Sequence, residues 1–171
     1  VMLKRLEERH RELLLWLMNL ELDYLLTGNR LNLMKLDQKT IDAMVGAASE
    51  ALKHAYAPYS GKPQGAALLT AGGDIICGAT LEFATYGGSI SADTAALVNA
   101  ANLGHRQFQA LCLQPFDWPS GVTRQFYAEF GVEVSLLVPE KGESGHYKLV
   151  SWPELLPHHF GPKNLDQAKA K

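Results

Sequence analysis

An alternation of short strand-like runs with helical patterns, between residues 37 and 151, constrains the fold of this chain more than any other feature. Five apolar runs are typical of strands: GAALLT, DIICGAT, FQALCLQ, EVSLLVP and HYKLVS. A helical pattern precedes them, begins after Asp37 as its N-cap and ends near Ala55. Two more helical patterns, ADTAALVNAANL and GVTRQFYAEF, lie between the strand-like runs. This order predicts an α/β fold, with helices on both faces of a mixed sheet.

The segment before residue 37 has a different pattern. Residues 2–26 predict an amphipathic helix whose apolar positions recur every three or four residues. So wide an apolar face must be covered, either by the chain's own domain or by another subunit. We predict an N-terminal extension over 1–36, a main domain over 37–165 and a tail over 166–171. The predicted interface positions on the extension are Leu3, Leu6, Leu13, Leu17, Leu20 and Tyr24.

Composition limits the binding partners and cellular compartments that this chain is expected to have. The chain has 171 residues, and its 16 basic and 18 acidic residues give a net charge of -2, with no basic stripe for nucleic acid. We expect no membrane span and no signal peptide, because charges interrupt every apolar stretch near the start. Cys77 and Cys112 each lie in an apolar run, which predicts free buried thiols. This indicates an intracellular, reducing compartment without distinguishing cytoplasm from an organelle matrix.

Four motifs occur in an order and spacing that resemble the cytidine deaminase family. AYAPYSGKPQGAALLT resembles the stretch before that family's first strand, and LEFATYGGSISADTAA resembles V-E-N-A-S-Y-G-x-T-I-C-A-E-R-T-A. WPSGVTRQFYAEFG is similar to S-P-C-G-A-C-R-Q-V-L-x-E-F, and LLPHHFGPKNL to L-L-P-x-x-F-G-P-x-x-L. The resemblance runs from about Ile41 to Leu165 and implies the family's three-layer fold.

The same resemblance implies which positions would hold a metal and transfer protons. In that family three cysteines, or one histidine and two cysteines, hold a zinc ion, and a glutamate carries protons. The first ligand position is Ser91 here, the paired ligands are Ser120 and Thr123, and the glutamate position is Asp93. Neutral hydroxyls do not replace thiolates at a zinc site. We therefore expect no zinc and no zinc-dependent deamination, with Ser91 and Ser120 acting as helix N-caps.

The nucleoside pocket implied by the resemblance is also altered. Lys62 stands where the family has an aromatic residue, and Thr80 stands at a ribose-binding asparagine. Glu82 matches a ribose-binding glutamate, but an isolated carboxylate more often accepts structural hydrogen bonds. Phe83 replaces an asparagine and would fill or close the cleft. Arg124 would need a new partner, for which Asp93, a backbone carbonyl and solvent are all candidates.

Other matches concern assembly. Tyr86 lies in the Y-G segment and Phe160 in the F-G-P segment, both of which the resemblance places near subunit contacts. His158 and His159 are adjacent, so their side chains point apart and do not predict a metal site.

The sequence supports two functional hypotheses. The first is a catalytically inactive deaminase-like protein, a pseudoenzyme with a structural or assembly role. It would be a homo-oligomer or a subunit of a larger complex. The alternative is a metal-independent enzyme, or a protein that binds a nucleoside-like or nucleotide-like ligand, with Lys62 meeting an anionic group and Asp93 acting as a base.

Overall fold

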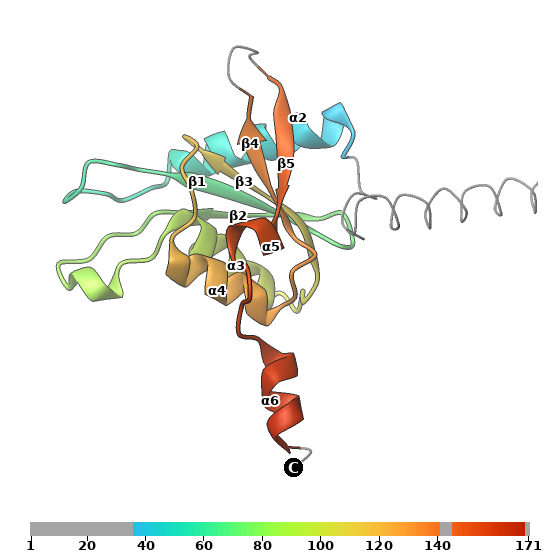
Figure 1. The fold of residues 1–171 in the computed structure, drawn as a ribbon. Coiled ribbons are helices and arrows are strands. Elements are labelled where there is room, and N and C mark those ends of the chain that lie inside the picture. The colour runs from blue at the N-terminus through green and yellow to red at the C-terminus, as the bar shows by residue number, and fades with distance from the viewer. Residues whose placement is uncertain (1–35, 141–144, 170–171) are drawn as a thin grey trace, which may run out of the picture. The chain divides into compact units, whose positions relative to one another are not determined.

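A mixed five-stranded sheet forms the centre of the computed structural model, which describes residues 36–140 and 145–169 (Figure 1). The strand order is β2-β1-β3-β4-β5. The strands are β1 Gly65–Thr70, β2 Ile75–Ala79, β3 Phe108–Gln114, β4 Ser135–Pro139 and β5 Tyr147–Ser151. The helices are α2 Gln38–Leu52, the short η2 Tyr86–Gly88, α3 Ala92–Asn102, α4 Gly121–Glu129, α5 Trp152–Leu155 and α6 Pro162–Lys169.

The connections explain why this sheet is mixed. β1 pairs antiparallel with both β2 and β3, so β2 and β3 run in the same direction and are joined through α3. β3 and β4 pair in parallel and are joined through α4. β4 and β5 are antiparallel neighbours. The ends of β2 and β3 that lead into α3 and α4 therefore lie at one edge of the sheet, next to the start of β1.

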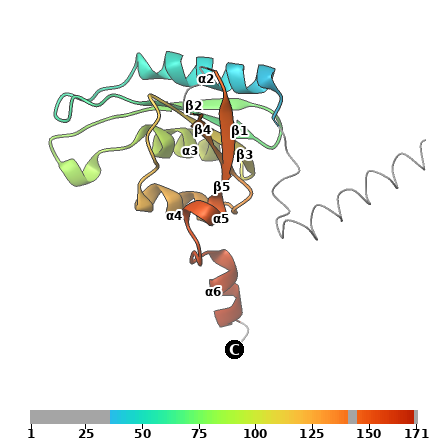
Figure 2. The same cartoon turned by 45° about the horizontal axis from the view of Figure 1, so that its top comes forward.

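The two faces of the sheet are covered by different helices. Alternate residues of a strand point to opposite faces, and β1 divides accordingly. Ala67 and Leu69 pack in the cluster that contains Ile41 and Met44 of α2. Ala66 and Leu68 belong to the other cluster, which holds side chains of α3, α4 and α5. The turned view in Figure 2 shows the three layers, with α2 on one face and α3 and α4 on the other.

Two glycines set how closely the helices approach the sheet. An added Cβ at Gly65 of β1 would overlap the backbone of Ala48 and Leu52 in α2. At Gly78 of β2 it would overlap the backbone of Ala92 and Ala96 in α3. Each helix thus meets its strand at a point where no side chain fits. This contact fixes the start of α3 against the end of β2.

The predicted fold class is confirmed, as are the order of the helices and strands in the main domain and the hairpin of β1 and β2. Asp37 is the N-cap of α2, where its carboxylate accepts a hydrogen bond from Thr40 N at 2.7 Å. The closing segment contains two helices, α5 and α6, which the sequence did not predict. The predicted N-terminal helix and its interface positions lie outside the described residues.

The two cysteines are free, but they differ in burial. Cys112 on β3 is fully buried in the cluster under α2, and burial raises the pKa of its thiol to about 11. Cys77 on β2 is only partly buried, and its Sγ lies 3.7 Å from Ala47 O. Within residues 36–140 and 145–169, no helix is long and apolar enough to cross a membrane.

Candidate functional site

The first turns of α3 and α4 bring four of the predicted site positions together at one edge of the sheet. Ser91 is the N-cap of α3 and Ser120 the N-cap of α4, while Asp93 and Thr123 lie in the first turns. Thr94 joins them from α3. We call these five residues the hydroxyl corner.

Hydrogen-bond distances link the side chains of the hydroxyl corner. Thr123 Oγ1 lies 3.1 Å from Ser120 Oγ, 3.5 Å from Ser91 Oγ and 3.4 Å from Asp93 Oδ1. Ser91 Oγ donates to Asp93 Oδ1 and lies 2.9 Å from Thr94 Oγ1. The backbone N–H of Thr94 donates to Asp93 Oδ1 at 2.8 Å. The corner is therefore a compact network built around one carboxylate.

Asp93 is the chemically distinctive member of this network. Its side chain is buried, at 2% exposure, and no cation pairs with it within the described part of the chain. Burial penalises the charged form and raises the pKa of the carboxyl, although the hydrogen bonds from Ser91, Thr94 and Thr123 lower it in part. A buried carboxyl with a raised pKa is typical of a group that transfers protons.

Tyr127 of α4 links the hydroxyl corner to the core. Its hydroxyl donates to the backbone oxygen of Asp93 at 3.0 Å, and its ring packs against Trp152 with a centroid distance of 4.8 Å. Burial, together with the nearby charge of Asp93, raises the pKa of Tyr127 well above its ordinary value. The phenol therefore stays neutral and ties α4 to the first turn of α3.

The predicted capping roles are half right. Ser120 accepts a hydrogen bond from Thr123 N at 3.1 Å, as expected of an N-cap. Ser91 occupies the N-cap position of α3, but its side chain accepts nothing from the helix backbone. The reason is that its hydroxyl hydrogen-bonds to Asp93 and Thr94 instead.

Arg124 does not reach Asp93. Its Nε donates to Pro119 O and its Nη1 to Leu155 O, both at 2.8 Å. Of the three partners proposed from the sequence, backbone carbonyls are the ones observed. Arg124 thus joins the start of α4 to α5 and does not pair with Asp93.

A cavity of about 520 Å³ opens at the same edge of the sheet. Two of the predicted pocket residues line it, Lys62 and Thr80. The segment after Thr80 leads to the corner, because Leu81 pairs with Ile90, the residue before Ser91. The remaining lining residues are Leu52, Gly61, Pro63, Gln64, Pro115, Phe116 and Asp117.

The other predicted pocket residues, Glu82, Phe83 and Arg124, do not line this cavity. Glu82 accepts hydrogen bonds from Tyr59 N at 2.9 Å and Ser60 N at 3.1 Å. Hydrogen bonding from Ser60, and next from Tyr59, lowers the pKa of this carboxyl. Phe83 is 47% exposed, with its backbone N–H bonded to Ser89 Oγ. Glu82 therefore holds the turn that precedes β1.

Sequence reasoning missed Thr94, Tyr127 and Asp117. Thr94 lies three residues after Ser91 and Tyr127 four after Thr123, spacings that place side chains on one helical face. Asp117 comes shortly after the end of β3, and Thr80 comes directly after the end of β2. Both strand ends lie at the same edge of the sheet. Helical spacing and strand ends were therefore signals that could have identified all three.

Comparison with known proteins identifies relatives of this chain. Residues 9–112 match the family model described as the cytidine and deoxycytidylate deaminase zinc-binding region. The chain is 32% identical over 123 residues to a Dictyostelium discoideum protein named "Probable cytidine deaminase", covering 67% of this chain and 84% of that protein. It is also 32% identical over 133 residues to a Sporosarcina psychrophila cytidine deaminase, covering 75% of this chain and 96% of that protein.

A solved structure extends the likeness to three dimensions. The cytidine deaminase of Burkholderia pseudomallei has a TM-score of 0.62 and 32% identity to this chain. The similarity covers 70% of this chain and 98% of that protein. Nearly the whole of the compared enzyme therefore has a counterpart here.

These comparisons contradict the prediction of a catalytically inactive pseudoenzyme kept as a structural subunit. The relatives carry the names of deaminases and share about a third of their residues with this chain. The prediction rested on hydroxyls at the three ligand positions, on aspartate in place of the glutamate and on the altered pocket residues. The structure adds that the carboxyl of Asp93 is buried at the start of α3 and that burial raises its pKa.

The prediction that zinc plays no part is contradicted as well, because the matching family model is a zinc-binding region. The residues at the corner nevertheless limit the role that a metal can be given. Ser91, Ser120 and Thr123 offer neutral hydroxyls, and no group of three or more His, Cys, Asp or Glu side chains gathers among the described residues. This donor set does not fit the thiolate and imidazole ligation typical of zinc.

Proposed function

Because this chain belongs to the cytidine and deoxycytidylate deaminase family, we propose that it binds a cytidine-like nucleoside and removes its exocyclic amino group by hydrolysis. The base would enter at the sheet edge where α3 and α4 begin. Asp93 is the catalytic residue of this proposal.

The observation that carries the proposal is the state of Asp93. The carboxyl is buried, its pKa is raised, and hydroxyls of the corner fix its orientation. A general base works best when its pKa lies near the working pH, and burial moves this group in that direction. Orientation matters equally, because a shift of about 1 Å can cost on the order of 100-fold in rate.

The proposed reaction balances with water as the only co-reactant. The Asp93 carboxylate accepts a proton from water as the oxygen attacks the amino-bearing carbon of the ring. The protonated carboxyl gives this proton to the ring nitrogen next to that carbon. The carboxylate then takes the remaining proton of the newly bound hydroxyl and passes it to the amino group as the carbon–nitrogen bond breaks. Ammonia leaves, and a carbonyl remains on the ring. The hydroxyls of Ser91 and Thr123 keep the carboxylate oxygen in position through these transfers.

The experiment is ammonia release from cytidine and deoxycytidine by the full chain, assayed both with added zinc and with a chelator. We expect turnover that Asp93→Asn lowers by about 100-fold to 10,000-fold, since the amide cannot accept the proton. Asp42→Asn is the matched control, because Asp42 is an exposed carboxylate on α2.

The two metal conditions make the result decisive. Turnover that depends on Asp93 in either condition supports the proposal, and the condition in which it occurs shows whether zinc is needed. Absence of ammonia release in both conditions, from a chain with an intact thermal transition, would overturn it.

A further inference from the structure

Helix α4 contacts Asp93 at both its carboxylate and its backbone. Thr123 Oγ1 lies 3.4 Å from Asp93 Oδ1, and the Tyr127 hydroxyl donates to the backbone oxygen of Asp93 at 3.0 Å. Thr123 and Tyr127 are four residues apart, so they lie on one face of α4. The neighbouring helix therefore holds the peptide of Asp93 as well as its side chain.

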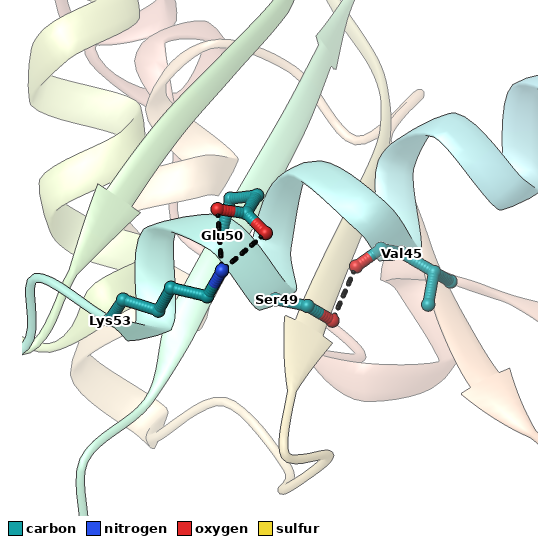
Figure 3. A network of polar contacts seen from close by, with 4 residues as sticks. All are labelled: Val45, Ser49, Glu50 and Lys53. Carbon is teal, nitrogen blue, oxygen red and sulfur yellow. Dashed lines mark hydrogen bonds and ion pairs between the residues drawn. The ribbon is translucent and has the colours of Figure 1, made fainter.

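The bond from Tyr127 differs from a hydroxyl bond within one helix. On α2, Ser49 Oγ donates to Val45 O at 2.8 Å, but both residues belong to the same helix and Ser49 is exposed (Figure 3). Tyr127 is fully buried, and its bond joins two helices. Breaking it would take from a buried carbonyl a partner that bulk water does not replace there. The bond therefore fixes the first turn of α3 against α4.

The position of Tyr127 is set in turn by α5. Its ring packs on Trp152, which is also fully buried, at a centroid distance of 4.8 Å. Trp152 Nε1 donates to Arg124 O at 2.9 Å, and Arg124 Nη1 donates to Leu155 O at 2.8 Å. Because these contacts hold α4 against α5, the Tyr127 hydroxyl has little freedom to follow a movement of α3.

The short side chain of Asp93 makes this placement matter. The deaminase motif has a glutamate at this position, which is one methylene group longer. An aspartate has only the torsions χ1 and χ2, so its carboxylate follows the backbone of the helix start closely. The motif S-P-C-G-A-C-R-Q-V-L-x-E-F has a leucine where this chain has Tyr127. The resemblance therefore does not imply this hydroxyl.

We propose that Tyr127 is a positioning residue for proton transfer by Asp93. Its hydroxyl holds the peptide oxygen of Asp93 and so keeps the carboxylate aligned with the reacting ring, while α5 holds α4. An alignment error of about 1 Å can cost on the order of 100-fold in rate. This inference rests on the proposed deamination and adds a residue that acts through Asp93 alone.

The test compares Tyr127→Phe with Tyr147→Phe in the full chain. Each change removes a hydrogen-bonded phenol hydroxyl, since that of Tyr147 accepts from Gln114 Nε2 at 3.2 Å. Tyr147 packs in the cluster under α2, on the other face of the sheet from Tyr127. We expect Tyr127→Phe to lower kcat about 10-fold to 100-fold and to leave KM within about twofold, because alignment acts on the transition state. Tyr147→Phe should change neither constant.

The pH profile separates positioning from a general loss of stability. Burial raises the pKa of Asp93, and the carboxyl must be ionised to act as a base. Without the Tyr127 hydroxyl, we expect water to enter the first turn of α3 and bring this pKa back toward its ordinary value. The acid limb of the kcat/KM profile should then move to lower pH in Tyr127→Phe and stay in place in Tyr147→Phe.

A measurement without substrate distinguishes this inference from the proposed function. Asp93→Asn should raise Tm by an amount that increases with pH, because asparagine does not ionise. In the Tyr127→Phe background we expect that increase to fall by about half or more, and in the Tyr147→Phe background we expect it to stay the same.

The outcomes separate as follows. Equal kcat values and equal acid limbs in the two phenylalanine variants overturn the inference and leave the deamination intact. If the wild-type chain releases no ammonia, the proposed function fails and the Tm measurement decides: a reduced increase with Tyr127→Phe supports the inference, and an unchanged one overturns it. If Tyr127→Phe does not fold, Arg124→Gln replaces it, because it removes the bond to Leu155 at a partly buried site. An unchanged kcat in that variant overturns the inference.

Discussion

Asp93 is a carboxyl whose surroundings favour its neutral form. It lies at the start of α3 at 2% exposure, with hydroxyls and backbone N–H groups as its neighbours instead of a cation. Burial is the largest influence on its pKa and raises it. The folded state therefore binds the Asp93 proton more tightly than the unfolded chain does, and stability must depend on pH through this residue.

The raised pKa determines the sign of that dependence. The stability that Asp93 contributes is fully present below its unfolded pKa, and it is lost as pH rises through its folded pKa. Asp93→Asn keeps the shape but does not ionise. We expect the Tm of Asp93→Asn minus that of the wild type to increase between about pH 4 and about pH 8. A difference that stays constant or decreases with pH, measured by thermal unfolding, contradicts this assignment.

At the residue scale, sequence reasoning identified most of the corner but not its hydrogen bonding. Ser91, Asp93, Ser120 and Thr123 do gather at one place. What the sequence could not show is that the Ser91 hydroxyl would hydrogen-bond to Asp93 instead of the helix backbone. Ser91 Oγ lies within hydrogen-bond distance of Asp93, Thr94 and Thr123, and spacing along the helix does not tell which of these side chains competes with the helix backbone.

At the scale of elements, the contact between α3 and β2 positions the corner. Gly78 lets the backbone of α3 lie against the strand, at Ala92 and Ala96. These residues flank Asp93 along the helix. A side chain at Gly78 would push the first turn of α3 away from the sheet and carry Asp93 with it.

We expect Gly78→Ala to lower the free energy of unfolding by about 2–3 kcal/mol or more, because backbone atoms cannot yield to the added methyl group. Gly46→Ala is the matched control. Gly46 is exposed in α2 with open space around it, so alanine should raise stability by about 0.5–1 kcal/mol. Urea unfolding of both variants checks this. Equal effects at the two sites would show that close helix–strand contact is not the cause.

The elements themselves were largely predictable. Apolar runs indicated the five strands, and the Asp37 cap indicated the start of α2. The short α5 was missed because it has a single turn of four residues, too few for a period to appear. Its start depends on a capping box, in which Ser151 N lies 3.2 Å from Glu154 Oε1.

At the scale of the whole molecule, apolar side chains remain exposed on α4 and beside it. Val122 is 63% and Phe126 46% exposed, and their spacing of four residues places them on one face of the helix. Phe160 is 57% exposed, and its backbone oxygen accepts from Gln125 Nε2 at 2.6 Å, which brings it next to α4. Exposed large apolar groups on α4 and beside it lead us to predict that another protein covers this surface.

We expect a second copy of this chain to cover that surface. The mass in solution by light scattering should then be at least twice the 18.8 kDa of one chain. Phe126→Asp should reduce it toward a single chain by placing a charge in the contact. Leu103→Asp, at an exposed apolar residue after α3, serves as control and should leave the mass unchanged. A wild-type chain that is already monomeric contradicts the expectation.

Tyr86 is 74% exposed, and its role as a subunit-contact residue stays a prediction.

The sequence was least informative about activity. Loss of thiolates at Ser91, Ser120 and Thr123 predicted an inactive protein, whereas the relatives of this chain carry the names of deaminases. Ligand identity is visible in a sequence, but the burial of a carboxylate and its resulting pKa are properties of the folded chain. That difference explains why the fold was predicted correctly and the function was not.

Chemical modification of Cys112 can report how often α2 separates from the sheet. The thiol lies between the sheet and α2, with its pKa raised to about 11, so in the closed state it is both shielded and unreactive. Cys77 is partly exposed and offers an internal reference. A thiol reagent will modify Cys112 only during the moments when α2 separates from β3. The rate of that modification therefore measures how often the layer under α2 opens, without any engineered label.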